Sequence, residues 1–376
     1  MDNKYDIVIV GMGPAGLAAA SKLGGSGLKF AMIDAGKGVY DRDRYDPDDA
    51  TRGDGGAGLF SDGKFSFFPS ASKLWSLPHD SNLKAAYDWT CSVLGAAGLD
   101  TPPFPKDLSA YSVVDPGTEA WVLKAYPSDY LSLDTRLKLV DDIVSSVASD
   151  VFRECNVKGI QYDSTTDDFT IHLKHERSQK HPFLKSRRLL LATGRFGPLA
   201  NFLKNLTKHH EFHRLEIGFR IQQTSDKAFF RNMRQLDPKL RVKGADGSAE
   251  WRTFCVCRQG ETCLTQTGGL WTVSGRSDCP PTGRSNSGFN TRIFDQELAK
   301  RATEPLFRAL SKSEAHFEVS AKGLLRGDVA VTERLDRIYG KELRFKMVDG
   351  LQKLSGAFDD LAQDEDAKLI GPTLEG

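Results

Sequence analysis

Three glycines near the N-terminus, Gly11, Gly13 and Gly16, have the type and spacing needed to hold a phosphate group. They follow the β-branched run 5–10 and precede the small residues of 17–23, which predicts a strand, a tight turn and a helix. Gly11 allows the turn, Gly13 lets the backbone approach a pyrophosphate, and Gly16 lets the helix pack on the strand. The N-terminus of that helix would offer unpaired N–H groups and the positive end of its dipole to the phosphates.

An acidic residue closes the next strand. The apolar run 30–33 ends at Asp34, eighteen residues after Gly16. An acid at this distance is placed to bind a ribose hydroxyl, and an acid rather than a base favours an unphosphorylated ribose. This βαβ pattern predicts FAD or NAD rather than NADP. The alternative is a glycine-rich turn in another kind of α/β protein.

A second glycine-rich stretch, 53–64, holds five glycines. Because glycine adopts backbone conformations closed to other residues, this stretch can run flat against a planar cofactor and present N–H groups to it. Ser61 and Lys64 would then supply donors beside a flavin. The alternative is a flexible surface loop, against which the apolar residues Leu59 and Phe60 argue.

Other polar residues are weaker candidates. The charged loop 37–52 contains Arg42, Arg44 and Arg52, which either reach dinucleotide phosphates or adenosine, or belong to a solvated loop. The apolar strand predicted at 187–191 runs into the small residues Ala192, Thr193 and Gly194. Small side chains there would let the backbone pass beside a nucleotide held by the first motif.

The six cysteines predict neither a disulfide scaffold nor a metal site. They are sparse for a chain of 376 residues, and the one cluster is Cys255-x-Cys257 followed by Cys263. A zinc site usually shows paired C-x-x-C or histidine partners at regular spacing, and neither is present. We therefore expect buried strand thiols and no metal.

Periodicity divides the chain into a first domain with alternating elements and a β-rich second domain. Within the first, we expect helices at 82–94 and 135–146, the latter capped by Asp134, and strands at 120–126, 151–162, 169–173 and 187–191. Strands follow at 215–222, 249–257, 262–267 and 270–273, with helices at 293–310 and 340–360. The expected domains are 1–208, 209–335, and a return to the first domain at 336–376.

The stretch 274–291 is predicted to be a long loop, because it is dense in Gly, Ser, Asn and Arg. Arg276, Arg284, Asn286 and Asn290 are its candidates for polar contacts with substrate or flavin. A solvated loop is the equally favoured alternative.

Composition narrows the class of protein. The formal net charge is +1, from 51 basic and 50 acidic residues, which indicates neither a nucleic-acid nor a membrane partner. No apolar run approaches the roughly 20 residues that span a bilayer, and the chain enters its first strand without a signal sequence. We expect a soluble cytoplasmic protein with reduced thiols that acts on a small molecule, in an oligomeric state that the sequence leaves open.

Three motifs together carry a family resemblance. They are V-I-V-G-M-G-P-A-G-L-A-A-A at 8–20, G-G-A-G-L-F-S-D-G-K at 55–64 and L-L-L-A-T-G-R-F-G at 189–197. The chain resembles FAD-dependent dehydrogenases of the glutathione-reductase-type flavoprotein fold, a likeness that R-T-F-C-V-C at 252–257 also fits. This resemblance implies an α/β fold, in which a Rossmann-like, three-layer FAD-binding domain carries an inserted β-rich α+β substrate domain.

The resemblance also assigns positions around FAD. It places the pyrophosphate at Gly11, Gly13, Pro14, Ala15 and Gly16, and the adenosine ribose at Asp34 with Ala35 and Arg42 nearby. It places Gly56, Ala57 and Ser61 along the flavin, Val157 by the adenine, and Ala192, Thr193 and Gly194 by the adenosine end.

One departure concerns the C-terminal end. Such proteins carry a late G-D motif that holds the ribityl chain, preceded in this family by a segment like I-G-P-T-x-E-G. Here that segment is 370–376, and the G-D pairs at 53–54 and 327–328 stand in other contexts. A fragment, a truncated gene product, or a protein that has lost part of its flavin site are the expectations that follow.

Several flavoenzyme classes lack their signatures. No cysteine pair stands close behind the first motif, no G-x-G-x-x-G between a strand and a helix recurs after residue 16, and the tryptophans are isolated. A dehydrogenase or oxidase that passes substrate hydride to flavin N5 remains. A flavin monooxygenase that uses an external reductant and a non-catalytic dinucleotide-binding protein are the alternatives. His209, His210 and His213 offer a conceivable base, but no catalytic residue is predicted.

Overall fold

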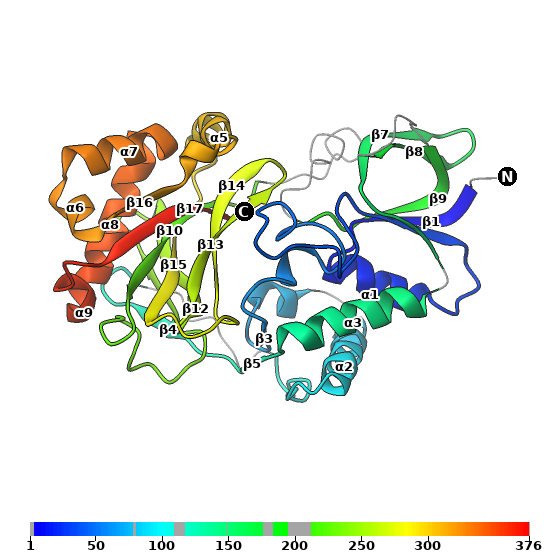
Figure 1. The fold of residues 1–376 in the computed structure, drawn as a ribbon, viewed down its shortest axis with the longest axis horizontal. Helices are drawn as coiled ribbons and strands as arrows, with labels where there is room; N and C mark the ends of the chain where they lie inside the picture. Colours follow the sequence, from blue (N-terminus) through cyan, green and yellow to red (C-terminus); the bar gives the residue numbers. More distant parts are fainter. Residues whose placement is uncertain are drawn as a thin grey trace. The chain divides into compact units, whose positions relative to one another are not determined.

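The computed structural model describes residues 4–77, 80–108, 117–147, 149–175, 183–194 and 212–375. These residues group into two compact units (Figure 1). Unit 1 takes its residues from Met1–Phe60, Leu133–Phe212 and Thr265–Gly269, and unit 2 from Ser61–Ser132, His213–Leu264 and Leu270–Gly376.

Unit 1 is a mixed α/β structure built on one sheet. In the described part of the chain its strand order is β6-β2-β1-β9-β8-β7. β1 is parallel to both β2 and β9, and β2 is parallel to β6, whereas β7, β8 and β9 are antiparallel. The bounds are β1 (Lys4–Val10), β2 (Phe30–Ile33), β6 (Asp150–Phe152), β7 (Cys155–Asp163), β8 (Asp168–His175) and β9 (Phe183–Leu191).

Both faces of this sheet are covered by apolar side chains, which explains why β1 reads as a continuous apolar run. Val8 and Val10 join a core cluster on one face, and Ile9 joins a second cluster on the other. The second cluster contains residues of α1 (Pro14–Leu23) and α3 (Leu133–Ser146), which pack against each other. Figure 1 shows these two helices side by side.

Unit 2 is built on an antiparallel sheet, whose described strands follow the order β16-β17-β10-β15-β12-β11-β4. The bounds are β4 (Val122–Lys124), β10 (Leu215–Thr224), β11 (Lys239–Lys243), β12 (Ala249–Cys257), β15 (Arg284–Ile293), β16 (Phe317–Ser320) and β17 (Lys368–Glu375). The helices are α2 (Asp80–Ala96), α5 (Gln296–Leu310), α6 (Ala321–Arg326), α7 (Val329–Tyr339), α8 (Lys341–Ala357) and α9 (Asp359–Ala362). Two smaller sheets of two strands each pair β3 (Lys64–Ser66) with β5 (Ser128–Tyr130), and β13 (Glu261–Thr267) with β14 (Leu270–Arg276).

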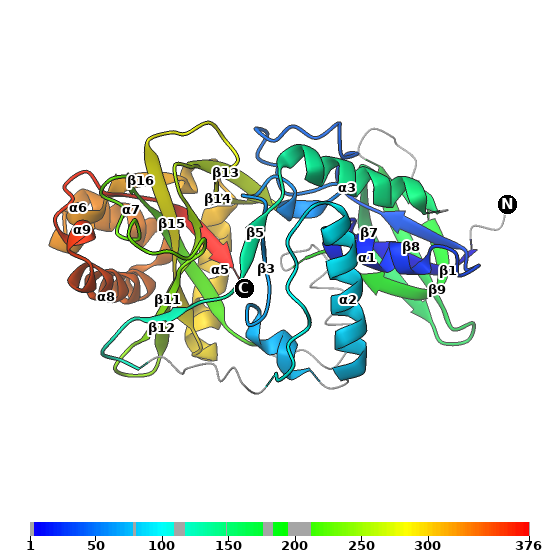
Figure 2. The same cartoon turned by 90° about the horizontal axis from the view of Figure 1, so that it is seen from below.

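The unit 2 sheet has an apolar face covered by helices. Ile217, Phe219 and Ile221 alternate along β10 and are almost fully buried. The helices α6 to α9 gather on one side of the sheet (Figure 2). On that side the Trp251 indole lies so close to α8 that a Cβ added to Gly350 would meet it at 2.1 Å.

The opposite face of the same sheet is polar and also buried. The alternate β10 residues Glu216 and Arg220 each have 1% of their surface exposed, and Asn290 of β15 has none. Strand β14 covers part of this face, because a Cβ added to its Gly275 would lie 2.4 Å from the Arg220 guanidinium. Buried polar groups need partners, so this face holds a network of hydrogen bonds and ion pairs.

Most predicted elements are present, with three corrections. The predicted loop 274–291 is wrong, because residues Arg284–Ile293 form β15, paired along its length between β10 and β12. The predicted strand 151–162 is interrupted between β6 and β7, where Glu154 has a φ of 52°. The predicted helix 293–310 starts three residues late, since Ile293 belongs to β15.

The two units do not follow the expected boundaries at 208 and 335. Residues 61–132 group with the β-rich unit, and so do residues 336–375, because β17 pairs with β10. The division into functional domains stays a prediction.

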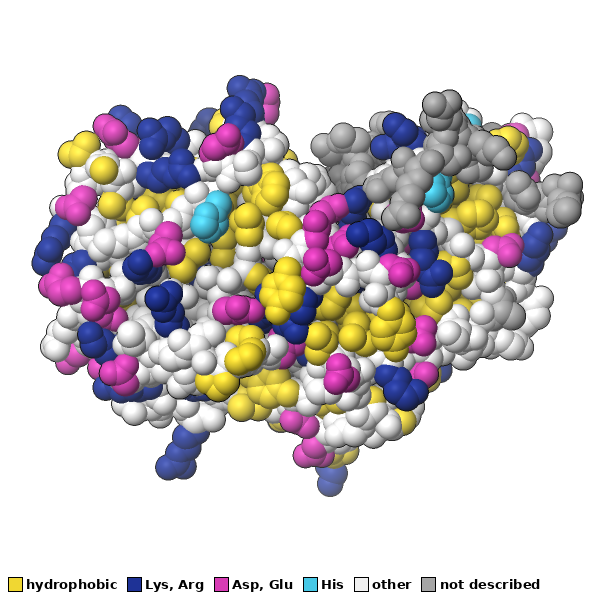
Figure 3. All heavy atoms as spheres, in the orientation of Figure 1, with side chains coloured by type: hydrophobic (Ala, Val, Ile, Leu, Met, Phe, Trp, Pro, Cys, Tyr) yellow, Lys and Arg dark blue, Asp and Glu magenta, His cyan; other side chains and the backbone are white. Residues whose placement is uncertain are grey.

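Among the described residues, no helix is both long and apolar enough to cross a membrane. Acidic and basic side chains are interspersed over the face seen in Figure 3.

Candidate dinucleotide-binding site

Two positions at the junction of β1 and α1 accept only glycine. Gly11 has a φ of +103°, and a Cβ there would lie 2.4 Å from the carbonyl oxygen of Ala192. A Cβ on Gly16 would lie 1.9 Å from the Gly11 carbonyl oxygen. The Ala192 N–H also donates to Val10. The structure thus brings together the first motif and the small residues after β9, as the sequence predicts.

The N-terminus of α1 is open to a ligand. Gly13 is its N-cap and makes no side-chain capping bond, and Pro14 occupies the first turn. The Leu17 N–H donates to the Gly13 carbonyl oxygen at 3.0 Å. The N–H groups of a helix's first turn have no intrahelical acceptor, and here Pro14 and Ala15 are exposed. An anion can therefore approach this end of the helix.

Gly13 itself has room around it. Its φ is −73°, which any residue adopts, and a Cβ there would find its nearest heavy atom, the Gly56 Cα, 3.8 Å away. The requirement for glycine at this position is therefore not set by the fold of the described residues. It is consistent with an external group that must come close to the backbone.

The second glycine-rich stretch begins against the first. Gly56 has a φ of +64°, and a Cβ on it would lie 2.9 Å from the Gly13 Cα. The Gly55 N–H donates to the Met12 carbonyl at 2.8 Å. Ala57 follows and is exposed. Residues 53–58 therefore border the same helix N-terminus, where a dinucleotide would be bound.

Asp34 connects the three loops around this site. One carboxylate oxygen accepts the Met12 N–H at 2.7 Å, and the other accepts those of Gly36 at 2.8 Å and Gly53 at 3.0 Å. The side chain is 9% exposed, with Ala35 half-buried beside it. The observed role of Asp34 is to fix the loops, and its contact with a ribose stays a prediction.

Arg42 is also occupied within the loop. It is buried, and its guanidinium donates to the carbonyl oxygens of Asp49, Asp54 and Gly56. It also lies 4.8 Å from the centre of the Phe60 ring. Burial lowers the pKa of Arg42 to about 10, so the group is charged at neutral pH. Arg42 therefore holds this loop together, and its contact with the cofactor stays a prediction.

The other predicted residues fall in several places. Arg52 pairs with Asp48, and Arg44 lies over the Tyr45 ring. Val157 is buried in β7 opposite Leu173. Thr193 is half-buried and Gly194 exposed after β9. His209 and His210 lie outside the described residues, and His213 is exposed just before β10.

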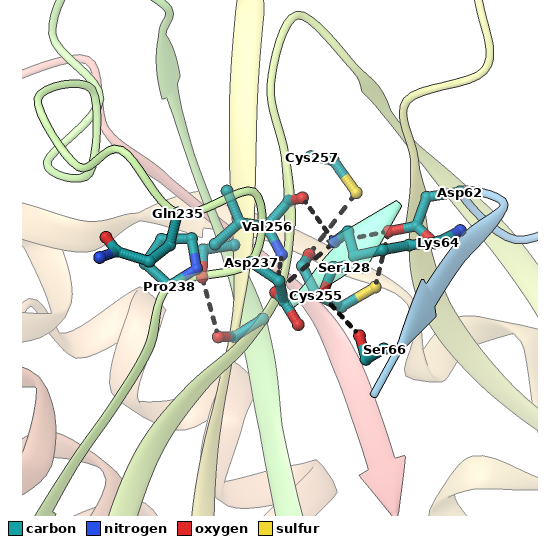
Figure 4. Close-up of polar contacts among 12 residues, drawn as sticks. Asp62, Lys64, Ser66, Ser128, Gln235, Asp237, Pro238, Cys255, Val256 and Cys257 are labelled. Carbon is teal, nitrogen blue, oxygen red and sulfur yellow. Dashed lines mark hydrogen bonds and ion pairs between the residues drawn. The ribbon is translucent and has the colours of Figure 1, made fainter. Parts of the chain in front are cut away.

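Ser61 and Lys64 belong to unit 2, where Lys64 enters a polar cluster (Figure 4). Its side chain is 5% exposed, and Nζ lies 2.9 Å from Asp62 and 3.5 Å from Asp237. Burial alone would lower the pKa of Lys64, but Asp237, with Asp62 nearby, raises it above its ordinary value. Lys64 therefore stays protonated and positively charged at neutral pH.

Asp237, which was not predicted from the sequence, makes several contacts in this cluster. Its carboxylate accepts the Tyr126 hydroxyl at 2.8 Å and the Val256 N–H at 3.0 Å. Burial opposes the charge of Asp237, yet Lys64 and Lys239 lower its pKa. A cavity of about 220 Å³ opens beside it, lined by residues of four segments of unit 2. The lining residues are Asp62, Lys64, Ser66, Asp237, Lys239, Arg252, Phe254, Cys255 and Glu375.

The candidates from the expected loop 274–291 hold the sheet together. Asn286 and Asn290 are fully buried in β15. Asn290 accepts the Thr373 hydroxyl at 2.8 Å, and Arg276 pairs with Glu261. Arg284 is exposed at the start of β15. Arg276 and Asn290 thus have partners in unit 2, whereas the side-chain nitrogens of Asn286 and Asn290 are buried without a hydrogen-bond partner among the described residues. Contact of these residues with substrate or flavin stays a prediction.

The residues of unit 1 fit the ADP part of a dinucleotide. The N-terminus of α1 carries N–H groups for a pyrophosphate, and the backbone at Gly13 leaves the space that close approach needs. FAD and NAD share this part of their structure, so these residues alone do not distinguish the two.

Comparisons with known proteins find only distant likenesses. No protein-family model matches the chain, and no curated protein matches it. A flavoprotein/dehydrogenase from Cytophaga hutchinsonii matches with a TM-score of 0.35 and 13% identity over 78% of this chain and 57% of that one. The OxyS anhydrotetracycline hydroxylase from Streptomyces rimosus matches with a TM-score of 0.38 and 12% identity over 80% of this chain and 49% of that one.

This chain therefore spans about half the length of the solved structures that it matches. At such low similarity, the function of this chain has to be argued from its own residues.

Proposed function

We propose that this protein is an FAD-dependent oxidoreductase, which holds the ADP half of FAD at the N-terminus of α1. The observation that carries the proposal is the glycine cradle. Gly11 and Gly16 are required by packing, whereas Gly13 has space for a side chain and none is present. A bound pyrophosphate requires a residue without a side chain beside a helix N-terminus whose N–H groups are uncapped.

Two observations favour FAD over NAD. The motif at 55–64 resembles that of FAD-dependent dehydrogenases, and its first residues border Gly13 in the structure. After residue 16, the sequence shows no G-x-G-x-x-G between a predicted strand and a predicted helix that would serve a separate nicotinamide cofactor. The ADP part of FAD would be held by the α1 N–H groups, with Asp34 fixing the loops on either side of it.

When bound, FAD would supply a two-electron acceptor for hydride from a substrate. The chain's own residues would bind and orient the cofactor. The substrate is unidentified, and oxidation of an organic small molecule is the reaction class that the proposal names. A monooxygenase that uses an external reductant and a non-catalytic dinucleotide-binding protein are the competing functions.

The first experiment is a binding measurement on the full chain. We expect FAD to bind stoichiometrically, with its visible absorption bands perturbed, and ADP-ribose to compete with it. Tight binding of NAD with no uptake of FAD would contradict the FAD assignment. A protein that binds none of these ligands would contradict the proposal as a whole.

A second experiment separates the enzymatic functions. Anaerobic addition of candidate substrates should bleach the flavin absorbance if the protein is a dehydrogenase or oxidase. Bleaching by NADH or NADPH alone, followed by oxygen-dependent product formation, would favour the monooxygenase. A flavin that none of these reagents reduces would favour the non-catalytic function.

A further inference from the structure

Cys255 and Cys257 lie together on unit 2, beside the cavity of about 220 Å³. The two sulfur atoms and a carboxylate oxygen of Asp62 all lie within 4.8 Å of one another. Figure 4 shows Cys255 and Cys257 on β12 with Asp62 and Lys64 close by. Cys255 is half-buried and lines the cavity, whereas Cys257 is fully buried behind it.

The backbone of β12 is distorted at Cys255. The register between β12 and β15 shifts between Phe254 and Cys257, which marks a bulge. Within it Cys255 has a φ of 47°, a conformation that costs a non-glycine residue of order 1–3 kcal/mol. Residues 255 and 257 would lie on the same face of an undistorted strand, so the bulge alters how the two side chains are oriented relative to each other. Such strain persists only where the surroundings enforce it.

A buried cation lies against the pair. The Arg220 guanidinium is 1% exposed and donates to the Asn286 side chain at 2.5 Å and to the Cys255 carbonyl at 2.6 Å. Its third contact is the Cys257 sulfur, at 3.5 Å. Among the described residues, no carboxylate lies within ion-pair distance of Arg220.

Burial would lower the pKa of Arg220, but the neighbouring Cys257, Cys255, Cys263 and Asp62 raise it, so this buried guanidinium stays charged. A hydrogen bond from Cys255 and the nearby Arg220 lower the pKa of Cys257, although burial opposes them. Its hydrogen bond to Cys257, together with burial and Asp62, raises the pKa of Cys255. The Cys255 thiol donates to a carboxylate oxygen of Asp62 at 3.6 Å, and the Cys257 thiol donates to the Cys255 carbonyl oxygen at 3.5 Å.

We propose that Cys255 and Cys257 form a redox-active dithiol, which a small organic disulfide oxidises from the cavity. The Cys255 sulfur attacks the disulfide while its proton passes to the Asp62 carboxylate, which leaves a mixed disulfide on Cys255 and releases one thiolate. The Cys257 sulfur then attacks Cys255, and its proton leaves with the second thiol. The first thiolate takes the proton from Asp62, so one disulfide is reduced to two thiols and the protein gains one disulfide.

The charges around the pair favour this chemistry over a metal cation. Lys64 lies 2.9 Å from the Asp62 carboxylate, and Arg220 lies 3.5 Å from the Cys257 sulfur. These two cations stabilise the anionic groups that a metal would otherwise neutralise. The site is independent of the proposed FAD site, and its test needs no cofactor.

The test is thiol mapping on the full chain, incubated with oxidised glutathione at a series of redox potentials. After denaturation and alkylation, peptide mass spectrometry reports each cysteine. We expect a disulfide between Cys255 and Cys257 that dithiothreitol reverses. The other four cysteines, Cys91, Cys155, Cys263 and Cys279, serve as internal controls and should stay reduced.

Two variants test the order of events. Cys257→Ser should accumulate the mixed disulfide on Cys255, because the resolving thiol is missing. Cys255→Ser should leave Cys257 unreacted, because that sulfur is buried. Arg220→Gln should slow oxidation by about tenfold or more, while Arg220→Lys should restore much of the rate.

The wild-type result decides the proposal even if a variant fails to fold. Free Cys255 and Cys257 after incubation, or a disulfide that involves another cysteine, would overturn it. So would one equivalent of tightly bound zinc in the protein as purified. Equal reactivity of Cys257 in Cys255→Ser and in the wild type would overturn the assigned order of attack.

Discussion

Gly13→Ala separates cofactor binding from folding more sharply than any other single change at the candidate site. In the structure the added methyl group meets nothing closer than 3.8 Å, and the backbone φ of −73° suits alanine. Such a substitution restricts the unfolded chain, an effect worth about 0.4–1 kcal/mol, but alanine is a poorer N-cap than glycine, so stability without FAD should change little. The same methyl group would stand where the pyrophosphate has to approach the backbone, so FAD should bind at least about a hundredfold more weakly, or about 2.7 kcal/mol.

The assay is FAD titration combined with urea unfolding. At an FAD concentration 100 times the dissociation constant, bound ligand stabilises the wild type by about 2.7 kcal/mol. At that same concentration a hundredfold weaker site would gain only about 0.4 kcal/mol. We therefore expect FAD to raise the stability of the wild type by about 2 kcal/mol more than that of Gly13→Ala.

Two further variants complete the comparison. Gly95→Ala in α2 is the matched control, because its methyl group also meets nothing closer than 3.8 Å, and it should leave FAD binding unchanged. Gly16→Ala should destabilise the fold by about 3 kcal/mol or more, since its methyl group would lie 1.9 Å from a carbonyl oxygen. Wild-type affinity for FAD in Gly13→Ala would refute the reasoning, as would unfolding of that variant without FAD.

Three other predictions concern the supports of the two units. Arg42→Met should cost about 2–4 kcal/mol of unfolding free energy in urea, since three buried carbonyl oxygens lose their donor; an unchanged midpoint would contradict this. Burial alone would raise the pKa of Glu216, but neighbouring guanidinium groups lower it to about 2. The ionised Glu216 should contribute about 3 kcal/mol to the free energy of unfolding at any pH above about 4.3, the pKa of a glutamate in the unfolded chain. This contribution should be lost as the pH falls toward 2, and Glu216→Gln should flatten that pH profile. Gly350→Ala should destabilise by about 1–3 kcal/mol through overpacking on an indole ring 2.1 Å away, whereas Gly356→Ala on the same helix meets nothing within 4 Å and should be neutral in thermal unfolding.

Local signals explain what the sequence could predict. The β1–α1–β2 pattern has the strand and helix periodicities within a single stretch of 30 residues, and its glycines stand where tight packing occurs in the structure. Strand 249–257 and the helix near 340–360 were also recognisable, because each has a continuous pattern that matches one element. The contact between Gly13 and Gly56 follows from proximity of two motifs, each predicted to meet the same ligand.

Long-range pairing explains what the sequence could not predict. The run S-N-S-G-F-N-T-R in β15 is rich in weak strand formers, so it reads as a loop. It forms a strand because β10 and β12 pair with it on both sides. Gly288 within it is explained by the Phe254 ring of β12, which a Cβ there would meet at 2.3 Å. Asp237 and Arg220 were missed for the same reason, since their partners are distant in the sequence.

The polar face of the unit 2 sheet has a structural consequence of its own, because it sets the strand register. Successive residues of a strand point to opposite faces, so a one-residue slip of β10 exchanges its two faces. The slip would move Phe219 into the polar network and bring Arg220 against the helices, where its charge would have no partner. Both side chains are fully buried in the observed register, each with matching neighbours. Weak strand formers can therefore specify one pairing, because the slipped register would bury a charge without a partner.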